Sequence, residues 1–314
     1  MAKVEFTKVE FKWWTYQRER FPVWKNGFLI AVFSSASVGY SQLVRGNLGL
    51  LDTKALLVAF ITVFLFFLQL RIADEFKDLE DDRRYRPYRP VPRGLITLRE
   101  LGWLAVLSMI GQWGLGIWLH PPLVNLLLLV WIYWGLMSQE FFMGTWLKQH
   151  PIVYMLSHMI ILPLINFYAT ACDWLVQADS IPAISWYLIT SFLNGIVIEV
   201  GRKIRAPQDE EVGVETYSSL WGVDRAVAVW GSVMTLAGIT SFFAAVSMGM
   251  KLVVVVLTLG FGAKIAQMGI ASNQHPKSEQ TKWIETLSGL WVITLYFFLG
   301  IAPNLLALMP AVSF

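Results

Sequence analysis

The chain has 314 residues, of which 56% are hydrophobic and 15% charged, and its mean hydropathy is +0.54. The apolar residues come in long blocks instead of alternating with polar ones, which is typical of a polytopic membrane protein. The formal net charge is only +3, and the basic residues form no separate domain, so a nucleic-acid partner is not expected. The single cysteine, Cys172, excludes an intrachain disulfide and fits neither a zinc cluster nor a redox pair.

The N-terminal segment, residues 1–26, mixes aromatic residues with lysine and arginine. That blend is typical of a segment that lies at a bilayer surface. The segment has no short apolar core followed by small residues, so no cleavable signal peptide is expected. We therefore predict an interfacial lead-in at residues 1–26 and a single transmembrane domain over residues 27–314.

Nine apolar segments follow, each close to the length that crosses a bilayer. They cover residues 27–44, 55–72, 98–119, 123–137, 152–171, 181–198, 226–246, 252–271 and 283–308. Little more than His120, Pro121 and Pro122 separates the third and fourth segments, which predicts a tight hairpin between adjacent helices. The expected fold class is all-α, with nine transmembrane helices.

Nine spans would place the N-terminus and the loops after the second, fourth, sixth and eighth spans on one side of the membrane. Nearly all of the 25 lysines and arginines lie on that side, whereas the opposite loops hold Arg45, Lys54 and Lys251. By the positive-inside rule the richer side is cytoplasmic. We predict a multi-pass protein of the plasma or inner membrane whose N-terminus and charged loops face the cytoplasm.

The most highly charged stretch follows the second span. Six acidic residues over positions 74–82 precede five arginines over positions 83–93. Asp74, Asp78 and Asp82 recur every fourth residue, so on a helix their carboxylates would share one face. Like charges at that spacing repel each other, and a divalent cation would compensate them. The alternative is a solvated helix end that follows membrane topology, which applies most to Arg83, Arg84, Arg86 and Arg93.

A second charged stretch follows the sixth span on the same side, so a shared cytoplasmic site is expected. Mg²⁺ prefers a few carboxylates together with waters and phosphate oxygens, and guanidinium groups bind phosphate oxygens in pairs. Glu199 could be a metal ligand, a partner of Lys203, or both.

Three further polar residues lie in or beside apolar segments. Glu140 follows the fourth span, where it could be interfacial, and His158 and Asn166 lie within the fifth. Polar groups at such positions either form hydrogen bonds between helices or line a cavity. We keep all three as possible cavity residues.

These motifs resemble the UbiA superfamily of intramembrane prenyltransferases. That family carries an Asn-x-x-x-Asp-x-x-x-Asp motif and an Arg-Pro-x-Pro-x-Gly tail after its second helix, and an Asp-x-x-x-Asp motif followed by Gly and Thr after its sixth. Asp78 and Asp82 match the first motif, with Asp74 at its opening position, and residues 89–94 match the tail. The second motif is matched by Asp209, Gly213 and Thr216.

The resemblance implies nine helices around a central cavity open to the cytoplasmic side. It also implies Mg²⁺ as cofactor and an isoprenyl diphosphate, of farnesyl or geranylgeranyl type, taken from the lipid bilayer. The metal ligands are then expected to be Asp74, Asp78, Asp82 and Asp209, which also take catalytic roles with Glu199 beside them. The residues expected to bind the diphosphate are Arg89, Arg202, Lys203 and Arg205.

Three departures from the family pattern bear on the reaction. Asp74 replaces the usual Asn, Arg205 stands where the second motif has its first Asp, and residues 146–151 lack the Tyr-Pro-x-x-Lys-Arg element usual in aromatic prenyltransferases. The Asp-Glu-Phe-Lys-Asp form of the first motif resembles the UbiA-type terpene cyclases. We therefore expect cyclisation to a terpene, with transfer to an aromatic or lipid acceptor as the alternative. A cation-coupled transporter is a distant third, because it predicts charges near the bilayer midplane and this chain keeps nearly all of them at helix ends.

Overall fold

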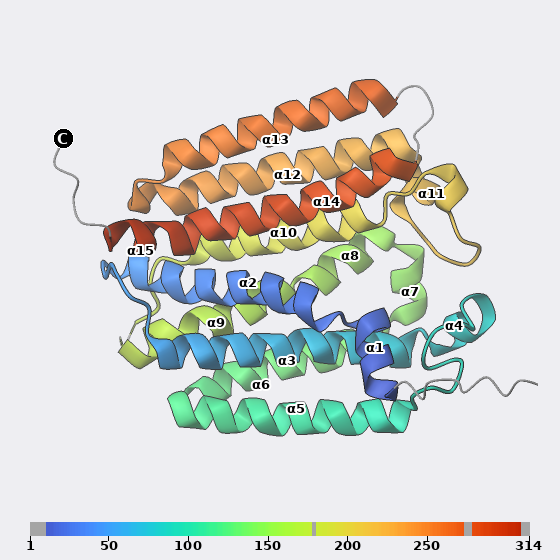
Figure 1. Ribbon diagram of the computed structural model, residues 1–314, viewed down its shortest axis with the longest axis horizontal. Helices are drawn as coiled ribbons and strands as arrows, with labels where there is room; N and C mark the ends of the chain where they lie inside the picture. The colour runs from blue at the N-terminus through green and yellow to red at the C-terminus, as the bar shows by residue number, and fades with distance from the viewer. Residues whose placement is uncertain (1–10, 178–179, 273–277, 309–314) are drawn as a thin grey trace, which may run out of the picture.

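A computed structural model describes residues 11–177, 180–272 and 278–308, and within these ranges the chain is helical without a β-strand. The long helices lie side by side along one axis, and most of the short ones gather at one end of the molecule (Figure 1). The long helices are α2 (Val23–Val44), α3 (Thr53–Lys77), α5 (Leu98–Leu119), α6 (Leu123–Ser138), α8 (Pro151–Met159) with α9 (Ile161–Gln177), α10 (Ser185–Arg202), α12 (Val223–Ala245), α13 (Lys251–Ser272) and α14 (Ser278–Tyr296), which η4 (Phe297–Ile301) and α15 (Ala302–Ala307) extend.

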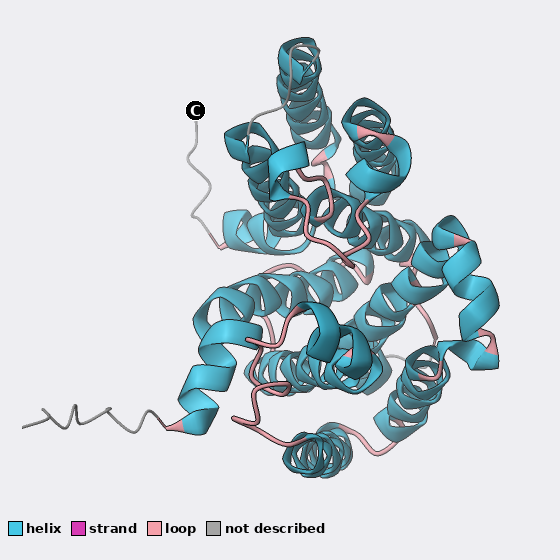
Figure 2. Cartoon of the chain, turned by 90° about the vertical axis from the view of Figure 1, so that its right-hand side faces the viewer, coloured by secondary structure: helices cyan, strands magenta, loops and turns pink. Residues whose placement is uncertain are grey.

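Short helices build the end that carries the charged loops. Figure 2 looks at this end, with the long helices running away from the viewer. The short helices are α1 (Lys12–Arg20), α4 (Leu79–Tyr85), η1 (Glu140–Phe142), α7 (Gly144–Gln149), η2 (Pro207–Asp209) and α11 (Tyr217–Trp221), with η3 (Val246–Met248) elsewhere in the chain.

Six helices in the described ranges are long and apolar enough to cross a membrane. They cover Val23–Val44, Thr53–Lys77, Leu98–Leu119, Pro151–Gln177, Val223–Ala245 and Thr281–Ala307, and Leu123–Ser138 is a shorter apolar helix. The all-helical membrane architecture is therefore confirmed. The count of nine spans and a cavity open to the cytoplasm stay predictions.

Close packing of small residues joins α2 to η4. A Cβ atom on Gly39 of α2 would lie 2.0 Å from the carbonyl oxygen of Gly300 in η4. Small residues let helix backbones approach in this way where lipid supplies no hydrophobic driving force between helices. Buried amides do similar work between α3 and α5, where Gln69 Nε2 donates to Gln112 Oε1 at 2.8 Å.

Several helix ends differ from the apolar segments that predicted them. The second apolar segment ends at residue 72, yet α3 continues to Lys77, because hydropathy marks the edge of the bilayer and charged residues can continue a helix. The fifth is divided at Ile160 into α8 and α9. Pro163 explains the division, since it has no N–H to donate to Met159 and its ring crowds that carbonyl.

The N-terminal segment contains a helix of its own. Residues 1–10 lie outside the described ranges, α1 follows from Lys12, and α2 already begins at Val23. Tyr16 of α1 is only 2% exposed, so this helix is packed onto the protein. Figure 1 shows α1 crossing α3 near the charged end.

Candidate active site

The first acidic motif lies at the junction between α3 and α4. Asp74 is in the last turn of α3, and Asp78 caps that helix before α4 begins at Leu79. Asp82 lies inside α4 and is 1% exposed. The three carboxylates, four residues apart in the sequence, thus differ in environment. Asp82 is buried, Asp78 is half-buried and Asp74 is 49% exposed.

Arginines compensate two of these three carboxylates in the structure. Arg89 donates to both oxygens of Asp82 at 2.9 and 2.8 Å, and Arg86 lies 2.9 Å from the same carboxylate. Arg71 lies 3.4 Å from Asp74. The repulsion that predicted a cation is therefore relieved at Asp82 by two guanidinium groups, one of which we had predicted to bind diphosphate.

The carboxylate of Asp78 differs from those of Asp74 and Asp82 because it has no direct partner among the described residues. Burial, together with the negative charge of Asp74, raises the pKa of Asp78. No hydrogen bond or ion pair joins its side chain to another residue of the described ranges. A divalent cation beside Asp78 and Asp74 would remove this electrostatic penalty.

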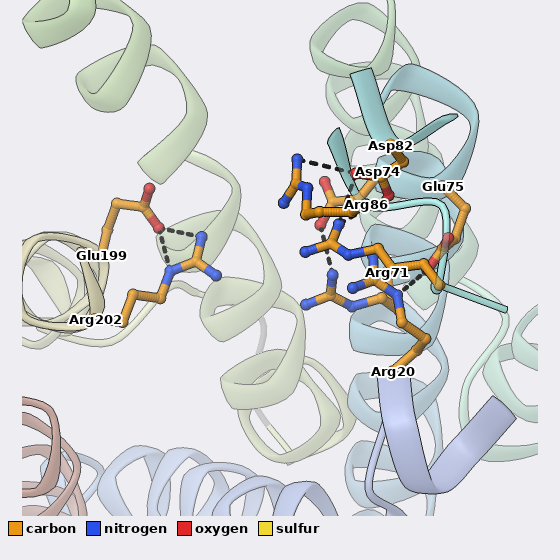
Figure 3. Close-up of polar contacts among 9 residues, drawn as sticks. Arg20, Arg71, Asp74, Glu75, Asp82, Arg86, Glu199 and Arg202 are labelled. Atoms are coloured by element: carbon orange, nitrogen blue, oxygen red, sulfur yellow. Dashed lines mark hydrogen bonds and ion pairs between the residues drawn. The ribbon is translucent and has the colours of Figure 1, made fainter. Parts of the chain in front are cut away.

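The second charged cluster lies at the end of α10 and faces the first. Glu199 accepts a hydrogen bond from Arg202 Nε at 2.7 Å and lies 3.0 Å from Lys203 Nζ. Figure 3 shows Arg202 extending from α10 towards Asp74 and Arg71, and Arg202 interacts electrostatically with Asp74. The Arg202 side chain is 48% exposed, so its remaining donors can reach a ligand. Glu199 is thus a partner of both cations, which agrees with one of the two roles expected for it.

The loop after α10 is held by its own polar contacts. Arg205 lies 3.2 Å from Glu211, and Asp209 accepts a hydrogen bond from Ser278 of α14 at 3.0 Å. Glu210 accepts from Thr216 at 2.7 Å and from Ser218 at 2.7 Å. These contacts give Arg205 and Asp209 positions on the loop without bringing them into contact with Asp74 or Asp78.

A glycine brings this loop against the first motif. Gly213 has φ +77°, a conformation that side chains rarely adopt, and a Cβ there would lie 2.4 Å from the ring of Tyr85 in α4. The two motif loops therefore pack together at the same end of the bundle. The family resemblance already matched Gly213 to the second motif. The structure explains why glycine is needed there, because a side chain would be strained and would clash with Tyr85.

Lys77 is a site residue that the sequence analysis missed. It contacts the hydroxyl of Tyr154 and lies 3.3 Å from Glu140 and 3.3 Å from His158 Nε2. His158 Nδ1 lies 2.8 Å from the Tyr154 carbonyl, which only accepts, so Nδ1 donates and Nε2 accepts from Lys77. Tyr154 also interacts electrostatically with Asp74 and other carboxylates of both clusters.

Two of the possible cavity residues, Glu140 and His158, thus meet at Lys77, and the third does not. Asn166 accepts a hydrogen bond from Ser37 at 2.5 Å inside the bundle, where it joins α9 to α2. A lysine within an acidic helix end is visible in the sequence. Its partners follow more than sixty residues later, and no local pattern connects them.

The donor set fits Mg²⁺ held jointly with a phosphate. Within the described ranges, no three acidic, cysteine or histidine side chains are grouped to hold a metal ion by themselves. Mg²⁺ does not require such a cage, because it keeps waters and phosphate oxygens among its ligands. Asp74 and Asp78 offer neighbouring carboxylates, and Arg202 faces them with positive charge (Figure 3).

This arrangement defines a helical membrane protein with a charged site at one end, suited to a polyanionic ligand. The model of the UbiA prenyltransferase family matches residues 84–288, more than half of the chain, and the protein belongs to that family. No curated protein matches the sequence.

Three solved structures share the fold of this chain. The chain is similar to a UbiA homologue from Aeropyrum pernix K1 in its apo form (16% identity, TM-score 0.65, covering 90% of this chain and 98% of that one). It is also similar to digeranylgeranylglyceryl phosphate synthase (15% identity, TM-score 0.58, covering 92% of this chain and 98% of that one). A third match is a UbiA homologue from Archaeoglobus fulgidus bound to DMAPP and Mg²⁺ (11% identity, TM-score 0.53, covering 91% of this chain and 99% of that one). At these identities the likeness is one of fold.

Proposed function

We propose that this protein ionises an isoprenyl diphosphate with the help of Mg²⁺ and cyclises the resulting cation to a terpene. The observation that carries the first half is the facing pair of clusters, with Asp74 and Asp78 at the end of α3 and Arg202 at the end of α10, where Lys203 follows it (Figure 3). A diphosphate is the kind of ligand that needs both a metal-binding side and a cationic side.

In this proposal the residues divide into three roles. Asp74, Asp78 and Asp209 bind the metal ion. Asp82, which the sequence also predicted to bind it, is instead proposed to hold Arg86 and Arg89 in place, because both arginines pair with its carboxylate. Bound Mg²⁺ would neutralise charge on the leaving diphosphate. The diphosphate oxygens accept hydrogen bonds from Arg202, Lys203, Arg205 and Arg89, and these donors stabilise the charge that develops as the carbon–oxygen bond breaks.

The hydrocarbon chain would lie among the helices, where water is excluded from the carbocation. We propose that the charged end faces the cytoplasm, because nearly all lysines and arginines gather there, and that the substrate enters from the surrounding leaflet. The chain length we propose is farnesyl or geranylgeranyl. The neighbour bound to DMAPP and Mg²⁺ supports a prenyl diphosphate as the ligand class.

Cyclisation is favoured by the Asp-Glu-Phe-Lys-Asp form of the first motif and by the missing Tyr-Pro-x-x-Lys-Arg element. Transfer of the prenyl group to a lipophilic acceptor is the second candidate. The fold shared with digeranylgeranylglyceryl phosphate synthase is the observation that favours it.

One assay separates the two reactions. Purified protein given farnesyl or geranylgeranyl diphosphate and Mg²⁺ alone should form a cyclic hydrocarbon or alcohol, detected by gas chromatography with mass spectrometry. Without an acceptor, the cation reacts with its own double bonds, and the cyclised cation then loses a proton to give a hydrocarbon or adds water and loses a proton to give an alcohol. Slow hydrolysis alone, with turnover restored by a quinone precursor or another lipophilic acceptor, would reject the cyclase and establish the transferase.

A further inference from the structure

The N-terminal helix α1 is tied to three parts of the chain that follow it at long distance. Lys12 pairs with Glu100 of α5, Glu19 lies 2.9 Å from Arg93, and Arg20 lies 2.5 Å from Glu75 of α3. All three partners belong to the segment that contains the first acidic motif or follows it.

These three ion pairs differ in burial. The side chains of Arg20 and Glu75 are 10% and 1% exposed, whereas those of Arg93 and Glu19 are 35% and 33% exposed. Exposed pairs contribute little, but breaking a buried pair leaves a charge without compensation. Glu75 Oε2 has no hydrogen-bond partner in the described structure, so the carboxylate depends on the bond that Arg20 makes to Oε1.

Apolar contacts on both sides of Arg20 in the sequence also hold α1 in place. Tyr16 belongs to a small buried cluster with Ile72 of α3, Val91 and Ile96. Phe21, just after α1, meets Phe64 of α3 edge to face at 5.3 Å between ring centroids. The helix is therefore held against the last turns of α3 and does not merely lie on the membrane surface.

Glu75 lies on a face of α3 next to the one that carries the proposed metal ligands. At about 100° per residue, Glu75 is roughly 60° from Asp78 and 100° from Asp74 around the helix axis. Figure 3 shows Arg20 reaching Glu75 while Asp74 lies on the side towards Arg202. Holding Glu75 in place thus fixes the rotation of the turn that presents Asp74 and Asp78.

A small rotation at this turn has a large effect on a metal site. A carboxylate lies about 5–6 Å from the helix axis, so a rotation of about 20° moves it by roughly 2 Å. Displacements of about 1 Å can cost on the order of a hundredfold in rate. A constraint on rotation is therefore a constraint on catalysis.

We infer that α1 is a positioning element of the active site, in which the buried Arg20–Glu75 pair sets the orientation of Asp74 and Asp78. Arg20 and Glu75 do not touch the substrate and act through the last turn of α3. The expected effect on diphosphate release rests on the proposed function. The expected effect on the orientation of Asp74 and Asp78 rests on the structure alone.

The test uses full-length Arg20→Met, which keeps side-chain length and removes charge. We expect the Mg²⁺ concentration for half-maximal diphosphate release to rise about tenfold, since misplaced ligands weaken the metal site. Amide hydrogen exchange over residues 72–82 should become faster. The matched control is Glu19→Gln, which breaks the exposed pair on the same helix and should change neither quantity by more than about twofold.

Two further variants separate positioning from general instability. Arg20→Lys keeps the charge without the fork and should recover part of the Mg²⁺ affinity. The double variant Arg20→Gln/Glu75→Gln replaces the ion pair with two neutral amides that can form a hydrogen bond with each other. It should fold, and its amide hydrogens over residues 72–82 should exchange more slowly than those of Arg20→Met. If Arg20→Met fails to fold, these two variants carry the comparison with Glu19→Gln.

The result that would overturn the inference is unchanged exchange over residues 72–82 together with unchanged Mg²⁺ dependence in the Arg20 variants. Failure of the proposed function looks different, because the wild-type protein itself would then release no diphosphate. The exchange measurement still decides the geometric claim in that case.

Discussion

At the scale of single residues, the site is built from carboxylates that differ in how their charge is compensated. Asp82 is saturated by Arg86 and Arg89, Asp74 has a partial partner in Arg71, and Asp78 is half-buried with a raised pKa. The charges of Lys77 and Arg86 offset only part of this rise in pKa, and a cation bound beside Asp78 would offset more of it. Among the proposed metal ligands of the first motif, Asp78 is the one whose side chain makes no hydrogen bond or ion pair within the described ranges.

Lys77 offers a test of the contacts that α3 makes with η1 and α8. Lys77→Met should lower the midpoint of thermal unfolding in detergent, because Glu140 and His158 lose the ammonium that joins them. Breaking such a half-buried pair costs about 2 kcal/mol. Lys148→Met, a change at a lysine on exposed α7, is the control and should leave the midpoint unchanged. Equal midpoints for Lys77→Met and wild type would show that this cluster is not structural.

Arg205 stands where the family usually has an acid, and we predict that it contacts the diphosphate. Its one ion pair in the described structure, to Glu211 at 3.2 Å, leaves donors for a ligand. Arg205→Lys keeps the charge but loses the two-pronged geometry, so the Michaelis constant for the diphosphate should rise several-fold. Arg99→Lys, on the exposed start of α5, serves as the matched control. An unchanged Michaelis constant for Arg205→Lys would place this residue with the arginines that only follow membrane topology.

At the scale of elements, the site depends on two loops that touch. Gly213→Ala would force a side chain into a left-handed conformation and drive its Cβ into Tyr85. We expect weaker diphosphate binding, because the second loop must move away from the first. Strain of this kind costs roughly 1–3 kcal/mol before the clash is counted.

Gly222 supplies the control for that experiment. Its φ is +80°, close to that of Gly213, but a Cβ there would meet nothing within 4 Å. Gly222→Ala therefore tests backbone strain without the contact to Tyr85. Equal loss of binding in the two variants would contradict a specific role for the contact between the loops.

The sequence predicted the two charged helix ends well because both are local patterns. Two patterns can be recognised without tertiary information. They are the recurrence of aspartate at every fourth position, in Asp74, Asp78 and Asp82, and the Arg-Pro-x-Pro-x-Gly match at residues 89–94. The use of Arg86 and Arg89 to neutralise Asp82 could not be read, because an arginine near an acid also fits membrane topology. Nor could the pairing of Arg20 with Glu75, which joins residues 55 positions apart.

At the scale of the whole molecule, the apolar segments located most helices but not their ends. Hydropathy reports where the bilayer lies, so it missed the last turn of α3, in which Asp74 and Lys77 are found. It also missed α1, whose polar sequence suggested only an interfacial segment. Both omissions fall at the charged end, where membrane, water and protein meet and no single pattern dominates.

The central claim is that the clusters on α3 and α10 form one Mg²⁺-dependent diphosphate site. It is tested most directly by measuring inorganic diphosphate released from geranylgeranyl diphosphate by the purified protein, with wild type, Asp78→Ala and Asp209→Ala compared at equal folded fraction. The account predicts release by the wild type that stops when EDTA removes Mg²⁺, and no release by either variant, since one half of the site cannot hold the ligand. Near wild-type release by Asp78→Ala or Asp209→Ala would contradict it.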